Sequence, residues 1–390
     1  MSRVLFLLAA LPLGCARPEC TPPDYRNPEC RVLAENALAQ LTQSDGVEVR
    51  FQSPTTSSTR SWEAKGLVSL SPEGTLSARV AALGNFRISV HRPDDGPETT
   101  SLIVTNVHPD IPPLAGEVSR TGLNRQLELD LTETVTEIRG ELPAELCAGT
   151  YRIAALADIQ TNPLQFAHIV EDLHREAREG EPLLGVLLLG DVAEFGSREE
   201  MDHVAEIMAS SPVPFAVTPG NHDVYADYDA VFNDTFGPGN HAFDVCDTHV
   251  VLVDTGNGVL APSVQGRLDV LMKTQQPLSI AGMHHPPYPG RTSSGWTRED
   301  QAQHLVAEFA ARGGDLLLAG HLHQRRLSSS TPVPQIIVGT GGATQYAVDP
   351  DYGYLRLRVD AGKLSTCFVS VPAPGSPGTQ APQRGPDTCK

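Results

Sequence analysis

Three apolar runs alternate with two amphipathic segments between residues 151 and 217, and this alternation constrains the fold more than any other feature of the chain. From Phe166 to Leu173, and again from Met201 to Met208, apolar residues recur at spacings of three and four, as on one face of a helix. Strand–helix–strand–helix–strand predicts parallel α/β winding, with ligand-binding residues at the carboxyl ends of the strands. The three runs comprise residues 151–157, 182–190 and 213–217.

Four further apolar runs follow, and we expect them to continue the same sheet; they comprise residues 249–255, 278–283, 315–320 and 335–339. Before residue 150 the pattern differs, because apolar and polar residues alternate in short runs such as Val47 to Phe51 and Phe86 to Val90. Runs of period two that are separated by Pro, Gly and Ser predict half-buried antiparallel strands. We interpret this region as a small β-sandwich that serves as a spacer or packing domain.

The chain therefore divides into segments of different character. The last of them is rich in Pro and Gly, which is typical of a chain without regular structure. We expect a signal peptide (1–14), a tether with one short helix from Arg31 to Leu41 (15–45), a β-rich accessory domain (46–146), an α/β domain (147–372) and a flexible tail (373–390).

The first residues have the pattern of an export signal. Arg3 precedes an apolar run, Val4 to Leu11, that is too short to span a bilayer. The run leads to Gly14 and Cys15 and resembles a bacterial lipoprotein signal, in which the cysteine becomes the lipidated N-terminus. A plain secretory signal cut near Cys15 is the alternative. Both interpretations predict export, either as a cell-envelope lipoprotein of the periplasm or outer membrane or as a secreted protein.

Cysteine usage agrees with export. Seven cysteines, less a lipidated Cys15, leave six, an even set that can pair as three disulfides in an oxidising compartment. Cys20 and Cys30 bracket a Pro-rich stretch and form the expected local pair, whereas the sequence does not choose among the full set of connectivities. No two cysteines have C-x-x-C spacing, which argues against thiolate zinc sites and thiol catalysis.

The charge balance limits the partners. Lys and Arg number 29 against 47 Asp and Glu, a net charge of −18. Such a surface repels phosphate backbones and anionic lipids, so we expect no nucleic-acid partner and no docking onto membranes by charge alone. Membrane contact is expected only through a lipid anchor at Cys15.

Metal-binding residue types follow several of the apolar runs directly. Of the 13 histidines, only His91 and His108 precede residue 150. Carboxylate, amide oxygen and imidazole suit hard and borderline metal ions. These groups occur in five ordered motifs: Ala157–Gln160 (ADIQ), Gly190–Asp191 (GD), Gly220–Asp223 (GNHD), Met283–Pro287 (MHHPP) and Gly320–His323 (GHLH).

This ordered set resembles the calcineurin-like metallophosphatase superfamily, whose pattern is Asp-x-His, Gly-Asp, Gly-Asn-His-Asp/Glu, His and Gly-His-x-His, over roughly residues 150–345. The resemblance implies an α/β fold with a β-sandwich core flanked by helices, preceded here by the small all-β domain. It also implies a metal-dependent phosphatase or phosphodiesterase with a dinuclear centre of Fe, Mn or Zn. Carried over by residue, Asp191 bridges the metals, Asp158 and His323 hold the first, and Asn221, His284 and His321 hold the second.

The resemblance implies the chemistry as well. A metal-bound hydroxide is the expected nucleophile, and His222 is the expected general acid, with Asp223 orienting its ring. Alternation along an extended segment would place His321 and His323 on one side, so that one motif serves both ions. For His285, a substrate contact and a packing role both stay open. The expected substrates are small phosphate esters, and monoesters and diesters are not distinguished.

The sequence departs from the superfamily at Gln160, where histidine is expected. Glutamine is a weaker, neutral ligand, so the first metal loses a donor unless another residue replaces it. Glu194, three residues after the bridging Asp191, is one candidate, and a polar loop residue without a metal role is the alternative that we favour slightly.

Two functions follow. The leading hypothesis is an exported hydrolase of phosphate esters; the alternative is a binding lipoprotein with a degenerate metal site and no turnover, for which Gln160 is the only support.

Overall fold

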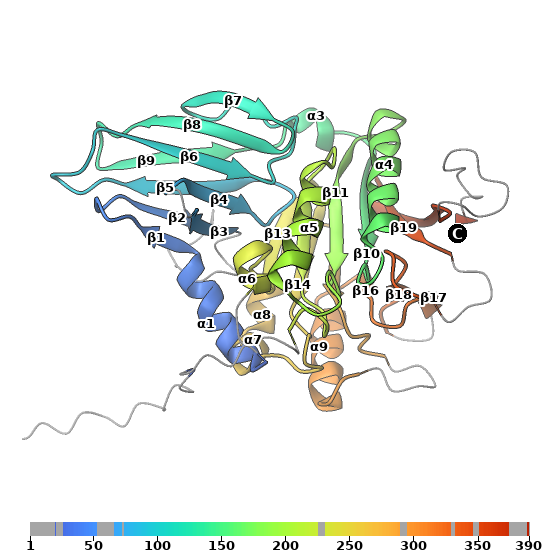
Figure 1. Cartoon of the computed structure of the whole chain (residues 1–390). Coiled ribbons are helices and arrows are strands. Elements are labelled where there is room, and N and C mark those ends of the chain that lie inside the picture. Colours follow the sequence, from blue (N-terminus) through green and yellow to red (C-terminus); the bar gives the residue numbers. More distant parts are fainter. Residues whose placement is uncertain are drawn as a thin grey trace, which may run out of the picture.

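The computed structural model of this chain contains two N-terminal β-sheets followed by a larger α/β unit (Figure 1). The expected signal peptide, Cys15 and most of the expected tail lie outside the residues that it describes. Within the described part, no helix is both long and apolar enough to cross a membrane. The described residues are 20, 26–52, 66–71, 74–224, 231–288, 295–328, 332–345, 351–373 and 388–389.

The N-terminal sheets confirm the prediction of a mainly antiparallel all-β region. One has the strand order β1-β2-β5-β9 and the other β3-β4-β6-β8-β7. Alternation decides their packing: in β8, Leu127 and Leu129 are buried while their neighbours are exposed. The strands are β1 (Gln40–Thr42), β2 (Glu48–Gln52), β3 (Gly66–Leu70), β4 (Leu76–Val80), β5 (Phe86–His91), β6 (Thr99–Thr105), β7 (Glu117–Thr121), β8 (Asn124–Asp130) and β9 (Val135–Gly140).

The α/β unit begins with the predicted parallel winding. β10 pairs with β11 and β11 with β12, all parallel, and two helices connect them. A capping box at Ser197 and Glu200 starts the second of these helices, and Asn162 caps the first. The elements are β10 (Tyr151–Leu156), α4 (Pro163–Arg178), β11 (Leu183–Leu189), α5 (Arg198–Ala209) and β12 (Phe215–Thr218), preceded by the short α3 (Ala144–Cys147).

The later apolar runs do not continue this sheet, so that expectation is wrong. They form a second six-stranded sheet of order β13-β14-β15-β16-β18-β17. The free edge of β10 is taken by β19, which returns antiparallel to it and leads into β20 and β21. The strands are β13 (His241–Val245), β14 (Thr248–Val253), β15 (Leu278–Met283), β16 (Leu316–Ala319), β17 (Arg325–Ser328), β18 (Gln335–Val338), β19 (Gly353–Asp360), β20 (Lys363–Ser370) and β21 (Thr388–Cys389).

The two six-stranded sheets form a sandwich between helices. In β11, Leu187 and Leu189 belong to the core shared with the second sheet, while Val186 and Leu188 pack under α4 and α5. On the second sheet, Val251 and Val253 face the helical side. The fully apolar strands are explained by burial on both faces. The helices on that side are α7 (Pro262–Gln265), α8 (Leu268–Leu271) and α9 (Glu299–Ala311).

The N-terminal helix α1 (Pro28–Leu38) starts three residues earlier than expected. Asn27 accepts a hydrogen bond from the Glu29 amide and Pro28 occupies the first turn, which fixes the start. The segment expected to be a tether is therefore packed here: α1 buries Cys30 and Val32 and contacts α6 (Val231–Thr235) (Figure 1).

Disulfides form as the cysteine count predicts. Cys20 and Cys30 are bonded, which confirms the expected local pair. Cys147 is bonded to Cys246 across 99 residues of chain. Cys367 is also disulfide-bonded, and it lies opposite Cys389 in the register of β20 and β21. This bonding is compatible with an exported protein.

Candidate metal centre

Five strand ends meet at one edge of the sandwich. β10, β11 and β12 end there from the first sheet, and β15 and β16 from the second. The two sheets are joined at this edge, because Nδ1 of His284 lies 2.9 Å from the Leu189 carbonyl oxygen. The residues that follow these strands are Asp158, Asp191, Asn221, His284 and His321, all expected as metal ligands.

The backbone around these residues turns sharply. Positive φ angles occur at Asp158 (62°), Gln160 (39°), Asp191 (51°), His321 (72°) and His323 (42°). Residues with a Cβ adopt this conformation at a cost, and such residues gather at functional sites. The expectation of an extended His321–His323 segment is wrong: β16 ends at Ala319, and the turn, rather than strand alternation, directs the two rings.

The first half of the centre consists of Asp158, Asp191 and His323, whose potential ligand atoms all lie within 4.8 Å of one another. His323 Nε2 is 3.5 Å from Asp158 Oδ1, and its Nδ1 is 3.0 Å from the Thr344 carbonyl oxygen. A carbonyl only accepts, so Nδ1 carries the hydrogen and Nε2 presents a lone pair to the centre.

The second half is built on Asn221, His284 and His321. Nε2 of His284 lies 3.1 Å from Asn221 Oδ1 and 3.2 Å from Asp191 Oδ2. Asn221 Oδ1 is also 2.9 Å from His321 Nδ1. Nδ1 of His284 donates its hydrogen to the Leu189 carbonyl, so Nε2 of His284 directs a lone pair toward these oxygen atoms. These atoms repel one another unless positive charge lies among them, so the donor set fits a cation.

The pKa values of the buried groups also indicate a cation site. Burial alone would lower the pKa of His284, but the charge and hydrogen bond of Asp191 raise it to about 9. Burial would raise the pKa of Asp191, yet the charge of His284 holds it below its usual range. The pKa of Asp158 rises to about 8, mainly through burial. The buried carboxylates thus have too little positive charge beside them, and together they would stabilise a cation bound between them.

His222 stands beside this centre and is partly exposed. Its backbone amide donates to Asp191 Oδ1 at 2.9 Å, which ties its position to the expected bridging carboxylate. Its ring Nδ1 lies 2.8 Å from the Glu194 carbonyl oxygen and 3.6 Å from Glu194 Oε2. Nδ1 therefore donates to the carbonyl.

Asp223 has a different task from the one expected. Its Oδ1 accepts from the amides of Val192 and Ala193 at 2.9 and 3.0 Å, and its Oδ2 from the Gly220 amide at 2.8 Å. It thereby holds the turns after β11 and β12 against each other. Among the described contacts, Glu194 rather than Asp223 orients the His222 ring.

Gln160 and Glu194 were the two candidates to complete the first metal site, and the structure places them differently. Gln160 is buried, and its Nε2 donates to Asp191 Oδ2 at 2.5 Å, so the amide contacts the expected bridging carboxylate. Glu194 belongs to neither group of potential ligands among the described residues and lies beside His222 instead. This arrangement favours a polar loop role for Glu194.

Two contributors were not assigned from the sequence. His285 joins His284 and His321 in a second group of potential ligands, and its buried Nδ1 has no hydrogen-bond partner within the described part of the chain. Its ring lies 4.3 Å from that of His321 and is 3% exposed, which limits its access to substrate. Thr255 Oγ1 accepts from the amides of His284 and His285 at 3.2 and 3.0 Å. The adjacent His284 and His285 could have indicated this second group from the sequence, whereas no sequence pattern marks Thr255.

Residues 151–325 match the family model for calcineurin-like phosphoesterases. No curated protein matches the chain. Among solved structures, the chain is similar to PhoD, at 11% identity and a TM-score of 0.49, covering 77% of this chain and 86% of that one. It is also similar to GAP50, the anchor in the inner membrane complex of Plasmodium, at 14% identity and a TM-score of 0.45, covering 57% and 85%.

A dimetal phosphatase from Danio rerio is a third similar structure, at 11% identity and a TM-score of 0.41, covering 56% of this chain and 96% of that one. The family match spans the strand ends that carry every expected ligand from Asp158 to His323. Residues 151–325 of this chain are therefore similar to a calcineurin-like phosphoesterase domain.

Proposed function

We propose that the chain is an exported hydrolase of small phosphate esters that works with two metal ions. The observation that carries the proposal is that expected ligands following strands of both sheets lie around the Asp191 carboxylate. Asp191 Oδ2 lies 3.2 Å from His284 Nε2, and Asp191 shares the first group with Asp158 and His323. One carboxylate thus reaches both halves of the centre, as a bridging ligand must.

In this proposal Asp158, Asp191 and His323 hold the first ion, and Asp191, Asn221, His284 and His321 hold the second. When bound, such ions polarise a phosphoryl oxygen and lower the pKa of water toward neutrality. Fe, Mn and Zn all suit carboxylate, amide and imidazole ligands. Fixed tautomers at His284 and His323 support the assignment, because each ring donates Nδ1–H to a backbone carbonyl and keeps Nε2 for the ion.

His222 is the general acid of the proposed reaction. Its Nδ1 is committed to the Glu194 carbonyl, so Nε2 is the atom that holds and moves the proton to the leaving oxygen. The Glu194 carboxylate lies beside the ring, with Oε2 3.6 Å from Nδ1. The His222 side chain is 25% exposed, which leaves it open to a bound ester.

Export, the lipid anchor at Cys15 and the division of the chain into an accessory domain (46–146) and an α/β domain (147–372) are part of the proposal. The disulfides support export, and the net charge of −18 supports small substrates over nucleic acids. The alternative, a binding lipoprotein without turnover, draws on Gln160, which places a neutral amide beside the expected bridging carboxylate.

The test is hydrolysis of a chromogenic phosphate monoester and a diester by metal-stripped protein, with Fe, Mn and Zn supplied in turn. We expect turnover of at least one ester with added metal and none without it. If the ions bind but neither ester is hydrolysed with any of them, the protein is the binding lipoprotein instead.

A further inference from the structure

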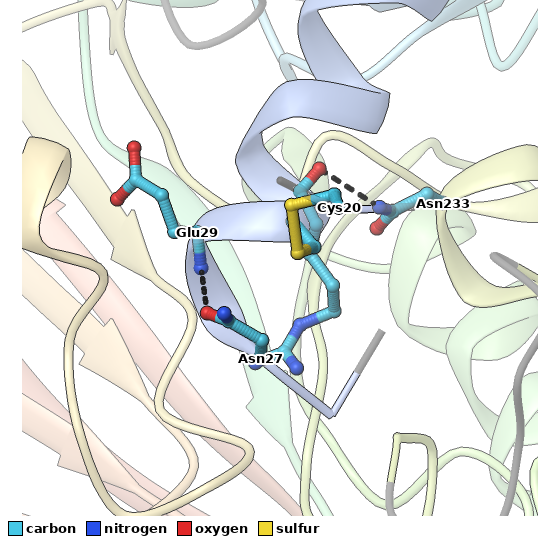
Figure 2. Close-up of a disulfide and its surroundings, with 6 residues drawn as sticks. Cys20, Asn27, Glu29 and Asn233 are labelled. Carbon is cyan, nitrogen blue, oxygen red and sulfur yellow. Dashed lines mark hydrogen bonds between the residues drawn. A yellow bond between two sulfur atoms is a disulfide. The ribbon is translucent and has the colours of Figure 1, made fainter. Parts of the chain in front are cut away.

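Helix α1 is fastened at its first turn to the α/β unit. The Cys20–Cys30 disulfide links the segment before the helix to its first turn, and Asn27 caps the helix (Figure 2). Asn233 Nδ2 donates to the Arg31 carbonyl oxygen at 3.2 Å. Glu29 Oε2 accepts from the Ser263 amide at 3.0 Å. The helix start is thus connected to two segments more than 200 residues away in the sequence.

Arg31 extends from this turn into a buried ion pair. Its Nε donates to Asp254 Oδ2 at 2.6 Å and its Nη2 to Asp254 Oδ1 at 2.9 Å, and both side chains are about 2% exposed or less. Its Nη1 donates to Asn257 Oδ1 at 2.7 Å. A guanidinium that binds a carboxylate through two parallel bonds fixes position and orientation, which the single ammonium of lysine does not.

Asp254 opens a loop, residues 254–258, that reaches the second half of the metal centre at three places. Thr255 Oγ1 accepts from the amides of His284 and His285. Gly258 accepts through its carbonyl from the Thr297 amide at 2.9 Å, next to the segment that covers His285. Gly256 packs so closely on Gly220 that an added Cβ would lie 2.9 Å from its carbonyl oxygen.

We propose that Arg31 is a positioning residue for the second metal ion. It holds the 254–258 loop, and the loop sets the backbone of His284 and packs against the turn that carries Asn221. The Cys20–Cys30 disulfide keeps the helix start in place, so the second half of the centre binds its ion more tightly in the oxidised protein. This inference rests on the proposed two-metal centre.

Among the described residues, the 254–258 loop contacts the second half of the centre and not the first. Its described contacts reach the segments of His284, His285 and Gly220, whereas Asp158 and His323 are held by Gly190, His321 and Thr344. Loosening the loop should therefore weaken one ion and spare the other. Changes to the support of metal ligands typically cost about 10–100-fold in affinity, and we expect the lower end for Arg31, which acts through two intervening residues.

The test compares Arg31→Lys with Arg152→Lys. Arg152 is a matched control, because it is an equally buried arginine paired with a buried Glu176 but sits at the start of β10, away from the ligand end. Calorimetric titration of each metal-stripped, oxidised protein with Mn²⁺ gives the affinity of each ion. We expect Arg31→Lys to weaken one ion about 10-fold and leave the other unchanged, and Arg152→Lys to change neither at a comparable loss of Tm.

Other results overturn the inference. Equal weakening of both ions, or the same change in both variants, would show a general loss of stability. If Arg31→Lys does not fold, Thr255→Val tests the same connection, and Thr255→Ser, which keeps the hydroxyl, should restore the affinity. Wild-type protein that binds none of Mn²⁺, Zn²⁺ and Fe²⁺ would instead refute the proposed function itself.

The role of the disulfide is tested by Cys20→Ser/Cys30→Ser, which should weaken the same ion by less than Arg31→Lys does. Unchanged affinity in this double variant would remove the disulfide from the proposal.

Discussion

The two halves of the candidate centre differ in how they are built. In the first half, two of the three expected ligands lie on the adjacent turns after β10 and β11, where Asp158, Gln160 and Asp191 contact one another, and His323 joins them from the turn after β16. The second half depends on the 254–258 loop and on α1, which precedes it by more than 200 residues. The comparison shows that ligands come from local motifs, whereas the support that orients them comes from distant parts of the chain.

Removing the residue that both halves share should have the largest effect. Asp191→Asn keeps the shape but removes the bridging charge, so we expect loss of both ions and at least a ~10⁴-fold fall in kcat/KM. Metal analysis and kinetics on the purified variant check this. Retention of one ion at full affinity would mean that the two halves do not share Asp191.

His222→Ala should leave both halves loaded. We expect turnover to fall by ~10²–10⁴-fold, the usual range for a general acid, with metal content unchanged. The loss should shrink for esters with good leaving groups, which need less protonation. A loss of metal together with activity would make His222 a ligand, and an equal loss for all leaving groups would remove its role as acid.

Substitutions of Gln160, which stands where the superfamily has histidine, test how the first half binds its ion. We expect Gln160→Ala to weaken one ion by about 10-fold, because the amide that contacts Asp191 Oδ2 is lost. Glu194→Gln should leave metal content unchanged, and Gln160→His should be tolerated, since histidine restores the superfamily pattern. Metal titration of the three variants decides, and the reverse order, with Glu194→Gln the damaging change, would make Glu194 the donor.

The smallest expected effect concerns the helix that supports the second half. Glu35 on α1 is buried with its Oε1 2.5 Å from the Gly239 amide, and burial, followed by the charge of Asp254, raises its pKa from 4.5 to about 8. The folded protein therefore holds this proton to higher pH than the unfolded chain does. The stability that it contributes is complete below about pH 4.5 and is lost as the pH rises through about 8.

Glu35→Gln mimics the protonated acid and should flatten this dependence. Tm measured at pH 5 and at pH 9 should fall more in the wild type than in Glu35→Gln. The same fall in both proteins would show that Glu35 does not titrate in this range.

The sequence predicted the parts of the molecule that are encoded locally. Apolar continuity in 182–190 predicted the strand that ends at Leu189, two residues before Asp191, because burial on both faces leaves a short-range pattern. The GNHD and GHLH motifs likewise marked residues that the structure brings together. The resemblance implied a β-sandwich core, but the apolar pattern alone did not separate the second sheet from the first, because that separation depends on β19 occupying the edge of β10 from about 200 residues away.

Side-chain roles that depend on tertiary contacts were also beyond the sequence. Asp223 was expected to orient His222, yet its carboxylate satisfies three backbone amides, and only the folded turns place those amides around it. Arg31 lay in a segment expected to be a tether. Its role follows from Asp254, 223 residues further along the chain, which no local pattern connects to it.

The central claim is that both halves bind metal and act together on a phosphate ester. The most direct measurement is the metal content of protein purified without added metal, taken with turnover of the same sample before and after chelation. Our account predicts about two ions per chain and hydrolysis that chelation abolishes and added metal restores. One ion or none per chain, with no turnover after metal is added, would contradict it.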